Sequence, residues 1–223
     1  MEFINIPTEQ TTAITDAIMG VLAVACIYYI GMFKERNTYK TGIWQWVFIF
    51  LAVSAFIGAV AHGFEMSKGT NELFWKPITL FFGMMVALFV VGVIYDLKGE
   101  TAARKFLPIM VAIGVIFFVI VQVLSRYIEH YFIVFIAYEA IAMLFSVSAY
   151  AWLYIAKRKT GTGWMTLGIL LTIIGAVLQA SGAIHFTLIW EFDHNSVYHF
   201  VQMVAVLFLV KGIKKSVYVE KVT

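Results

Sequence analysis

The stretch FWKPITLFFGMMVALFVVGVIY, residues 74–95, decides the fold class of this chain. Its 22 residues contain a single charged side chain, that of Lys76. An α-helix needs about 20 apolar residues to cross the hydrocarbon core of a bilayer. A strand of a membrane barrel would instead show about ten residues of apolar and polar alternation. The stretch therefore predicts a membrane-spanning helix.

Six further runs of the same kind lie along the chain. The seven predicted spans cover residues 12–33, 43–64, 74–95, 106–125, 131–156, 164–186 and 195–213. The composition agrees, because 62% of the residues are hydrophobic and 13% are charged. Soluble domains are about 45–50% apolar and about 25% charged. We therefore predict an all-α integral membrane protein, in which residues 1–223 form a single domain of seven transmembrane helices.

Basic residues gather on one side of the predicted bundle. Thirteen of the 16 lysines and arginines lie near the ends of spans one, three, five and seven. The other side holds only Lys68, Lys76 and Arg126. Because basic connections stay in the cytoplasm, we expect an external N-terminus and a cytoplasmic C-terminus. The localisation that follows is the cell membrane, as a multi-pass protein.

The histidines show the opposite bias. All five are expected on the external side of the bundle: His62, His130, His185, His194 and His199. Ionisable residues within a span usually face the bundle interior or a water-filled cavity and pair there. The pattern therefore predicts a polar site in the external half of the bundle.

Helical depth and spacing select the members of this site. Asp16 lies roughly one turn into the first predicted span, and Glu139 roughly two turns into the fifth. Asn195 and His199 are four residues apart and share a helix face. Gln202 continues that face inward, and Ser54 shares a second face with His62.

These residues carry a resemblance to a known superfamily. A polar start of the first span, His62 at the end of the second, and Asn195-x-x-x-His199 in the seventh are similar to the alkaline ceramidases and adiponectin/progestin receptors. More closely, HNSVYHFVQMVAVLFLVKG (194–212) resembles an uncharacterised branch of bacterial seven-span proteins with an H-N-x-x-Y-H-x-x-Q signature.

The resemblance implies a zinc-dependent intramembrane hydrolase that acts on a lipid amide or ester. In the superfamily, one histidine of span two and two of span seven hold zinc. The implied ligands here are His62 and His199, with His194 as a third. The bacterial branch also implies a bacterial inner membrane as the location.

The chain departs from the superfamily at three places. Asn195 stands where the first histidine of span seven is expected, Gly58 stands at the expected serine, and the third span lacks an aspartate. Asp16 and Glu139 are then the candidate catalytic residues, and Asp193 is a further candidate for the missing ligand or base. Asn195, Ser54 and Gln202 would lie behind the metal ligands and orient a ligand or a water.

Other functions fit the same residues. A heptahelical sensor or binding protein would use the polar site for a ligand without chemistry. A haem protein would use His62 and His199 as axial ligands, and a retinal protein would use Lys211. His62 and His199 could also only lock two helices together. The run KRK at 157–159 predicts lipid headgroup contact and orientation, so membrane lipids are expected partners and nucleic acid is not.

Overall fold

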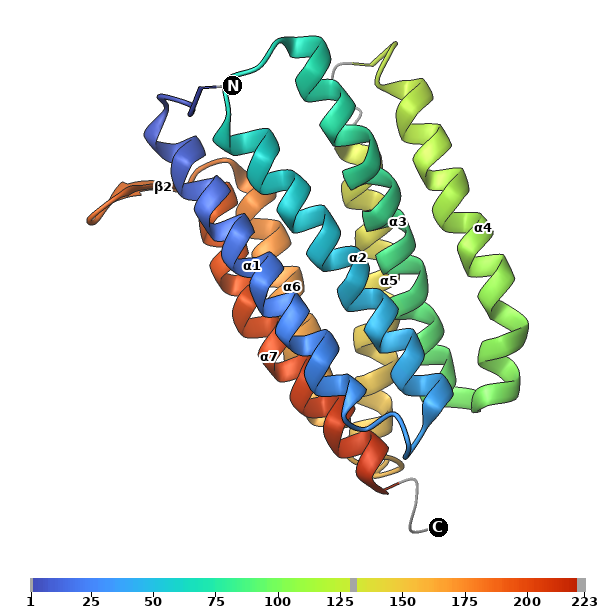
Figure 1. Cartoon of the computed structure of the whole chain (residues 1–223). Coiled ribbons are helices and arrows are strands. Elements are labelled where there is room, and N and C mark those ends of the chain that lie inside the picture. Colours follow the sequence, from blue (N-terminus) through green and yellow to red (C-terminus); the bar gives the residue numbers. More distant parts are fainter. Residues whose placement is uncertain (1, 129–131, 220–223) are drawn as a thin grey trace.

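The structure, a computed structural model, describes residues 2–128 and 132–219. Seven α-helices and one short β-hairpin account for most of these residues (Figure 1). The elements are α1 (Pro7–Gly31), α2 (Thr38–Gly63), α3 (Lys68–Lys98), α4 (Glu100–Leu124), α5 (Phe132–Ile155), α6 (Thr162–Ser181), β1 (His185–Thr187), β2 (Glu191–Asp193) and α7 (His194–Val219). All seven helices are long and apolar enough to cross a membrane. The all-α class and the number of helices are therefore confirmed.

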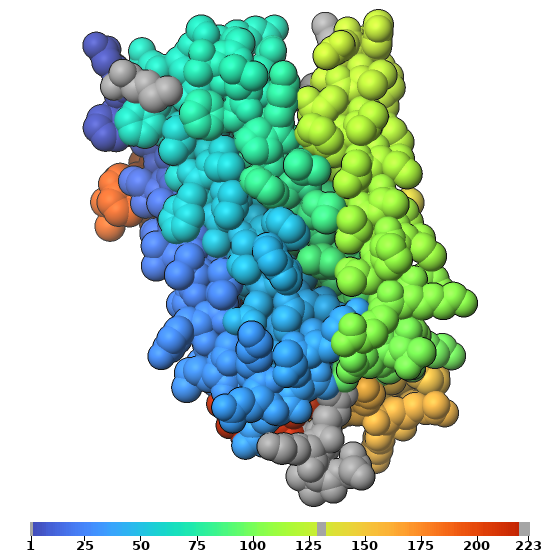
Figure 2. Space-filling model, turned by 45° about the vertical axis from the view of Figure 1, so that its right-hand side comes forward, coloured from blue at the N-terminus to red at the C-terminus, as the bar shows by residue number. Residues whose placement is uncertain are grey.

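The helices form one elongated bundle whose chain termini lie at opposite ends (Figure 1). We call these the N-terminal end and the C-terminal end of the bundle. α1 packs between α2 and α7, α3 contacts α2 and α5, and α6 packs between α5 and α7. These six helices close a ring, and α4 lies outside it, mainly against α3. Figure 2 shows α4 as a separate ridge along one edge of the molecule.

Local signals in the sequence place the starts of the helices. Pro7 occupies the first turn of α1, where its missing N–H costs nothing. The Asn37 side chain caps α2 by accepting from the backbone N–H of Lys40, and Ser67 caps α3 in the same way. Gly99 has a φ of 84° and separates α3 from α4. An L-side chain there would be strained, which explains the glycine.

α1 begins five residues before the predicted first span, and this changes the depth of Asp16. Because α1 starts at Pro7, Asp16 lies about two and a half turns into the helix rather than one. The acidic and polar start of the chain hid the first turns of α1 from a hydropathy reading.

The predicted end of the sixth span is also wrong. α6 ends at Ser181, and Gly182 follows with a left-handed φ of 60°. His185 therefore lies in β1, outside the helix, where it pairs with Asp193 of β2. The hairpin projects sideways near the N-terminal end (Figures 1 and 2). His130 lies outside the described residues.

The C-terminal end contains a buried ion pair that the sequence reading missed. Lys40 was expected in a connection, but it lies in the first turn of α2 with 0% of its surface exposed. Its Nζ is 2.6 Å from Oδ1 of Asp96, near the end of α3. Tyr150 of α5 donates a hydrogen bond of 2.9 Å to Oδ2 of the same carboxylate. These contacts join three helices at one level.

Candidate functional site

The site begins with a polar stripe on α1. Thr12, Thr15 and Asp16 are buried on the face of α1 that meets α2 and α7. Thr15 and Asp16 follow Thr12 at three and four residues, so both lie beside it on one side of the helix. Thr15 donates to the backbone oxygen of Thr12 at 2.9 Å, which satisfies one hydroxyl within the helix itself. The Asp16 carboxyl group faces α7, and the Thr12 hydroxyl faces β2.

Asp16 and His199 meet between α1 and α7. Oδ1 of Asp16 lies 3.3 Å from Nε2 of His199. Nδ1 of the same ring lies 2.9 Å from the Thr15 hydroxyl, so both ring nitrogens have partners on α1. Asp16 is only 7% exposed. A carboxylate at this depth needs such a partner, because an unpaired buried charge is costly.

A glycine makes room for the Asp16 carboxyl group. A Cβ atom at Gly58 of α2 would lie 2.7 Å from Oδ2 of Asp16 and 3.1 Å from its Cγ. Real Cβ contacts are longer, so only glycine lets the carboxyl group rest against the α2 backbone. Gly58 and His62 are four residues apart on α2, so α2 turns one face toward the acid.

Glu9 and His62 form a second acid–histidine pair nearer the N-terminal end. Nδ1 of His62 lies 2.6 Å from Oε2 of Glu9. The ring of His62 also packs edge-on against Trp75 of α3, with centroids 5.4 Å apart. Both side chains are more exposed than those of Asp16 and His199. Along α1, Glu9–His62 is therefore the outer pair, and Asp16–His199 is the inner, more buried pair.

The two pairs are electrostatically linked to each other and to the start of α7. The charge of His62 interacts with those of Asp16, Asp193 and His199. Asp193 accepts a hydrogen bond of 3.2 Å from Thr12, which ties β2 to α1. We call Glu9, Asp16, His62, Asp193 and His199 the acid–histidine cluster.

Asp193 has a second role as the cap of α7. Its Oδ1 accepts from the backbone N–H of Ser196 at 2.9 Å, and its own N–H donates to the Ser196 hydroxyl at 2.9 Å. This reciprocal pattern is a capping box. Burial raises the pKa of the Asp193 carboxyl, but the hydrogen bonds from Ser196 and Thr12 outweigh it and bring the pKa below its usual value.

The other polar residues of α7 point to a different neighbour. Asn195 accepts from Nε2 of Gln179 at 3.0 Å, and Gln202 accepts from the hydroxyl of Thr172 at 3.0 Å. Both partners belong to α6. Asn195 and Gln202 therefore hold α7 to α6, whereas His199 turns toward α1. The Asn195 amide also donates to Oδ2 of Asp193 at 3.4 Å, so it contacts the acid–histidine cluster as well. His194 is the first residue of α7, next to the capping aspartate.

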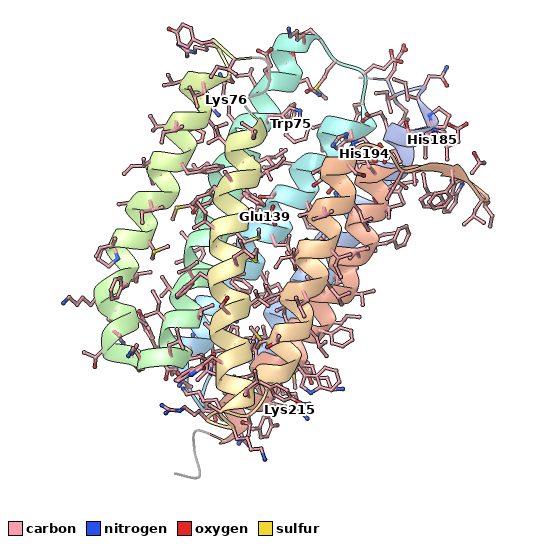
Figure 3. All side chains as sticks on the ribbon, turned by 180° about the vertical axis from the view of Figure 1, so that it is seen from behind. Trp75, Lys76, Glu139, His185, His194 and Lys215 are labelled. Atoms are coloured by element: carbon pink, nitrogen blue, oxygen red, sulfur yellow. The ribbon has the colours of Figure 1, made fainter. Side chains whose placement is uncertain are left out.

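The remaining candidates lie apart from the acid–histidine cluster. Figure 3 shows Glu139 on α5, between the end marked by His194 and the end marked by Lys215. Glu139 interacts electrostatically with Tyr198 of α7, which in turn interacts with Asp16. The Ser54 hydroxyl is buried on α2 and has no hydrogen-bond partner in the described part of the chain.

The donor atoms are not arranged for a metal ion. Within residues 2–128 and 132–219, no group of three or more His, Cys, Asp or Glu side chains could hold one. A catalytic zinc site needs three protein ligands converging on one point. Here His62 turns to Glu9, and both ring nitrogens of His199 already have partners. The side chains as placed do not fit zinc, and the zinc site stays a prediction.

Sequence reasoning missed Glu9, Thr12 and Thr15. Thr12 and Asp16 share a helical spacing with the buried Met19, a signal that could have extended the first helix toward Pro7. Glu9 then follows, seven residues before Asp16. The predicted start near residue 12 left these positions outside or at the edge of the helix.

Comparison with known proteins gives a family. Residues 11–217 match the model of a family described as a family of unknown function, DUF6962. The chain belongs to this family. The DUF6962 match includes Asp16, His62, Asp193 and His199, and it begins two residues after Glu9. No curated protein and no solved structure matches the chain.

Proposed function

We propose that this chain is a heptahelical ligand-binding or sensor protein of the cell membrane, and that its ligand site is the acid–histidine cluster. Seven helices of sufficient length and apolarity support the membrane placement. Basic residues concentrate at the C-terminal end, which supports a cytoplasmic C-terminus and an external N-terminus. The cluster then faces the outside.

The observation that carries the proposal is the buried pair of Asp16 and His199. An aspartate makes the insertion of a helix into a membrane less favourable, by about 2.5–3.5 kcal/mol at the helix centre. Ionisable residues within spans therefore mark functional sites by default. In this chain the Asp16 carboxyl group fits against Gly58 and pairs with His199. The Glu9–His62 pair lies between Asp16 and the N-terminal end of the bundle.

The charge of the cluster indicates the class of ligand. It contains three carboxyl groups and two histidines, so its acidic groups outnumber its basic ones. No lysine or arginine of the described residues forms an ion pair with Glu9, Asp16 or Asp193. The cluster therefore favours a small ligand with a cationic group, such as an amine, which would replace His199 as the partner of Asp16.

A thermal-shift experiment tests this function. Purified protein in detergent is screened against primary, quaternary and polyamines, each matched with a neutral alcohol of similar size. A ligand at 100 times its Kd stabilises the folded protein by about 2.7 kcal/mol. We expect an amine to raise the Tm of the wild type and of Glu72→Gln, an exposed acid at the same end, and to lose its effect in Asp16→Asn. A flat response to every amine would contradict the proposal.

The zinc-dependent lipid hydrolase is the second candidate, supported by His62 and His199, which both lie beside carboxyl groups at the N-terminal end of the bundle. Elemental analysis of protein purified without chelator separates the two functions. Stoichiometric zinc that is lost in both His62→Ala and His199→Ala would favour the hydrolase. Metal-free protein that still responds to amines would favour the binding function.

A further inference from the structure

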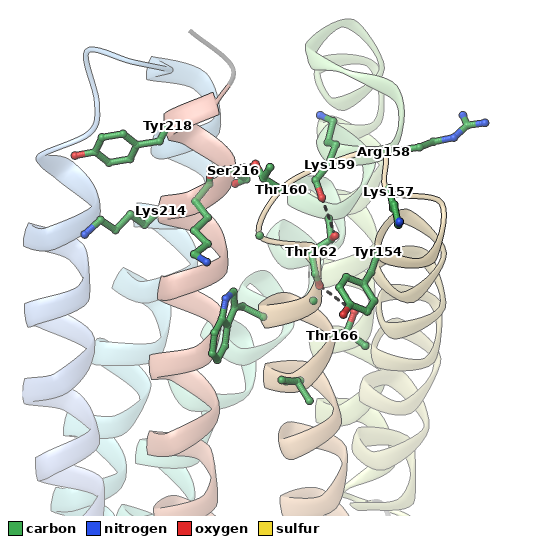
Figure 4. Close-up of a pocket in the computed structure, with 15 residues that line it drawn as sticks. Tyr154, Lys157, Arg158, Lys159, Thr160, Thr162, Thr166, Lys214, Ser216 and Tyr218 are labelled. Carbon is green, nitrogen blue, oxygen red and sulfur yellow. Dashed lines mark hydrogen bonds between the residues drawn. The ribbon is translucent and has the colours of Figure 1, made fainter. Parts of the chain in front are cut away.

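The C-terminal end of the bundle contains a groove that the proposed function does not use. It has a volume of about 1140 Å³ and lies between the turn joining α5 to α6 and the last turns of α7 (Figure 4). Its floor is narrow, because a Cβ at Gly161 would lie 2.3 Å from the backbone oxygen of Gly212. Gly161 also has a φ of 84°. Any other residue at this position would therefore both clash with Gly212 and strain the backbone.

The groove carries charge of one sign. Five of the described residues that line it are basic and none is acidic: Lys157, Arg158, Lys159, Lys214 and Lys215. The start of α6 also opens into it, and Gly161, as the cap of α6, has no side chain to occupy the first amides. Helix starts carry partial positive charge. All these charges favour an anion.

Three of the five basic side chains are already engaged elsewhere. Lys214 donates to the Tyr29 hydroxyl at 2.7 Å and points toward α1 in Figure 4. Lys159 lies 3.6 Å from Asp96, and Arg158 stacks over Trp152. Lys157 and Lys215 are exposed and make no ion pair within the described residues; Lys215 lies over the ring of Trp164 at 5.7 Å, which keeps it in the groove. These two lysines are the cations that a ligand in the groove would meet.

The backbone holds Lys157 in an unusual conformation. It has a φ of 50°, and no other non-glycine residue in the described part of the chain has a positive φ. Hydrogen bonds from Lys157 N–H to Tyr154 and from Arg158 N–H to Leu153 form the turn that ends α5. Glycine is the usual residue at this position of such a turn. A lysine there brings a cation to the groove at a backbone cost that glycine would avoid.

The side of the groove toward the middle of the bundle is apolar. Tyr154, Trp164 and Leu167 line it, and Tyr154 and Leu167 are largely exposed on the outer surface of the helices. Lys211 lies over the ring of Trp164 at 3.6 Å, as expected where an aromatic belt meets the headgroup region. A ligand in the groove would therefore touch cations at one end and an apolar helix surface at the other.

We propose that this groove binds an acidic phospholipid, with its phosphate between Lys157 and Lys215 and its acyl chains along Trp164 and Leu167. A free phosphate would use the cations but leave the apolar side uncovered. The inference rests on the membrane placement proposed above, but not on the acid–histidine cluster at the other end. Acidic lipids gain about fivefold in affinity for each lysine near the surface, so two lysines predict about 25-fold.

Native mass spectrometry in detergent tests the groove with phosphatidylglycerol, phosphatidylcholine and inorganic phosphate as probes. The test variant combines Lys157→Gly with Lys215→Gln. Glycine fits the left-handed turn, so the fold is retained while the cation is lost. The control combines Lys34→Gln with Lys105→Gln, two exposed lysines of the same end outside the groove. It changes the net charge by the same amount.

We expect the wild type and the control to retain one phosphatidylglycerol in preference to phosphatidylcholine, and the test variant to lose that preference about 25-fold. Equal losses in both variants would reduce the effect to general charge attraction and overturn the site. Equal retention of the two lipids would overturn it as well. Displacement of the lipid by millimolar inorganic phosphate would assign the groove to a free anion instead. None of these outcomes depends on Asp16, so this test and the amine screen fail separately.

Discussion

The two ends of the bundle both contain buried ionisable residues, but they use them differently. At the C-terminal end, Lys40 and Asp96 are 0% and 4% exposed, and both oxygens of Asp96 have a partner. At the N-terminal end, the ion-pair partner of Asp16 is a histidine, His199, at 3.3 Å. The C-terminal pair joins a lysine to an acid, whereas both pairs at the N-terminal end join an acid to a histidine.

We interpret this difference as one between a structural pair and the proposed ligand site. Lys40 and Asp96 cannot release each other without leaving a buried charge, so they fix α2 against α3. In the acid–histidine cluster, a neutral histidine leaves no buried charge of its own when it parts from its acid, provided that a cationic ligand takes its place beside Asp16. The proposed ligand could therefore enter the cluster, whereas the Lys40–Asp96 pair offers no such exchange. The predictions below test this contrast by the free energy of unfolding.

The largest effect is expected at the C-terminal end. Lys40→Ala leaves Asp96 buried without its main partner and should destabilise the protein by about 3–5 kcal/mol. Asp16→Asn keeps the shape of the acid and should cost only about 1 kcal/mol, the value of a lost hydrogen bond. Thermal unfolding in detergent measures both, with the exposed Lys34→Ala as the control.

The double variant Lys40→Met with Asp96→Leu sharpens this result when it is made together with Tyr150→Phe, so that no buried hydroxyl loses its acceptor. Replacement of a buried pair by apolar residues of similar size is often neutral, so most of the stability should return. If Asp16→Asn proved as destabilising as Lys40→Ala, the contrast between the ends would be lost and the cluster would be structural.

The second effect concerns the notch at Gly58. Gly58→Ala adds a methyl group 2.7 Å from the Asp16 carboxyl group, and overpacking of this kind costs about 1–3 kcal/mol. It should also displace Asp16 from His199 and weaken amine binding without changing any ionisable residue. Unfolding and the amine thermal shift measure the two consequences.

Gly42 provides the matched control on the same helix. A Cβ there meets nothing within 4 Å, so Gly42→Ala should be neutral or stabilising, since alanine favours a helix. Combining Gly58→Ala with Asp16→Ala should recover the stability lost to the clash, because the two residues are in contact. Additive losses would show that Asp16 does not rest against Gly58.

The sequence predicted the helices better than the contacts of their polar residues. Hydropathy alone gave seven helices, because each crossing needs a long apolar run whatever its neighbours are. Whether His199 faces α1 or α6 depends on the packing of three helices, and spacing on α7 could not decide it. The three residues of α7 therefore have different neighbours: His199 faces α1, Gln202 contacts Thr172 of α6, and Asn195 contacts both Gln179 of α6 and Asp193.

Residues near helix ends were the hardest to place. Lys40 and Glu9 were assigned to connections or ignored, because charged residues next to an apolar run usually lie in water. Lys40 is buried only because Asp96, 56 residues later, reaches it. The hairpin was missed because its apolar residues extended the sixth hydrophobic run past Gly182. Long-range pairing and a left-handed glycine are invisible to a hydropathy window.

A smaller effect is expected at Asp193, which joins the cluster to the cap of α7. Its pKa is lowered by folding, so its contribution is present above the unfolded pKa of about 3.9 and is lost as the pH falls through the folded value. Asp193→Ala should cost about 1 kcal/mol at pH 7. Asp193→Asn keeps a capping side chain and should mainly flatten the loss of stability between about pH 5 and 2.

Unfolding of these variants across that pH range provides the measurement. The exposed Glu65→Gln serves as the control, since it removes an acid at the same end of the bundle. An unchanged acid dependence in Asp193→Asn would show that the cap does not titrate with folding.

The smallest effect on stability is expected at the tip of the hairpin. Leu188, Ile189 and Trp190 are 77%, 89% and 59% exposed, although the strands that carry them are tied to α1 through Asp193. If the N-terminal end lies at an external bilayer surface, this apolar tip rests in the lipid beside the cluster.

Trp190→Phe should change the free energy of unfolding by less than about 0.5 kcal/mol. In liposomes, brominated lipids quench the fluorescence of tryptophans that lie in the bilayer. The Trp190→Phe variant should show a smaller quenched fraction than the wild type. Trp46→Phe, at the other end of the bundle, is the matched control for the loss of one exposed tryptophan. Quenching of Trp190 by iodide rather than by brominated lipid would place the tip in water, and the cluster would then open to solvent and not to the membrane.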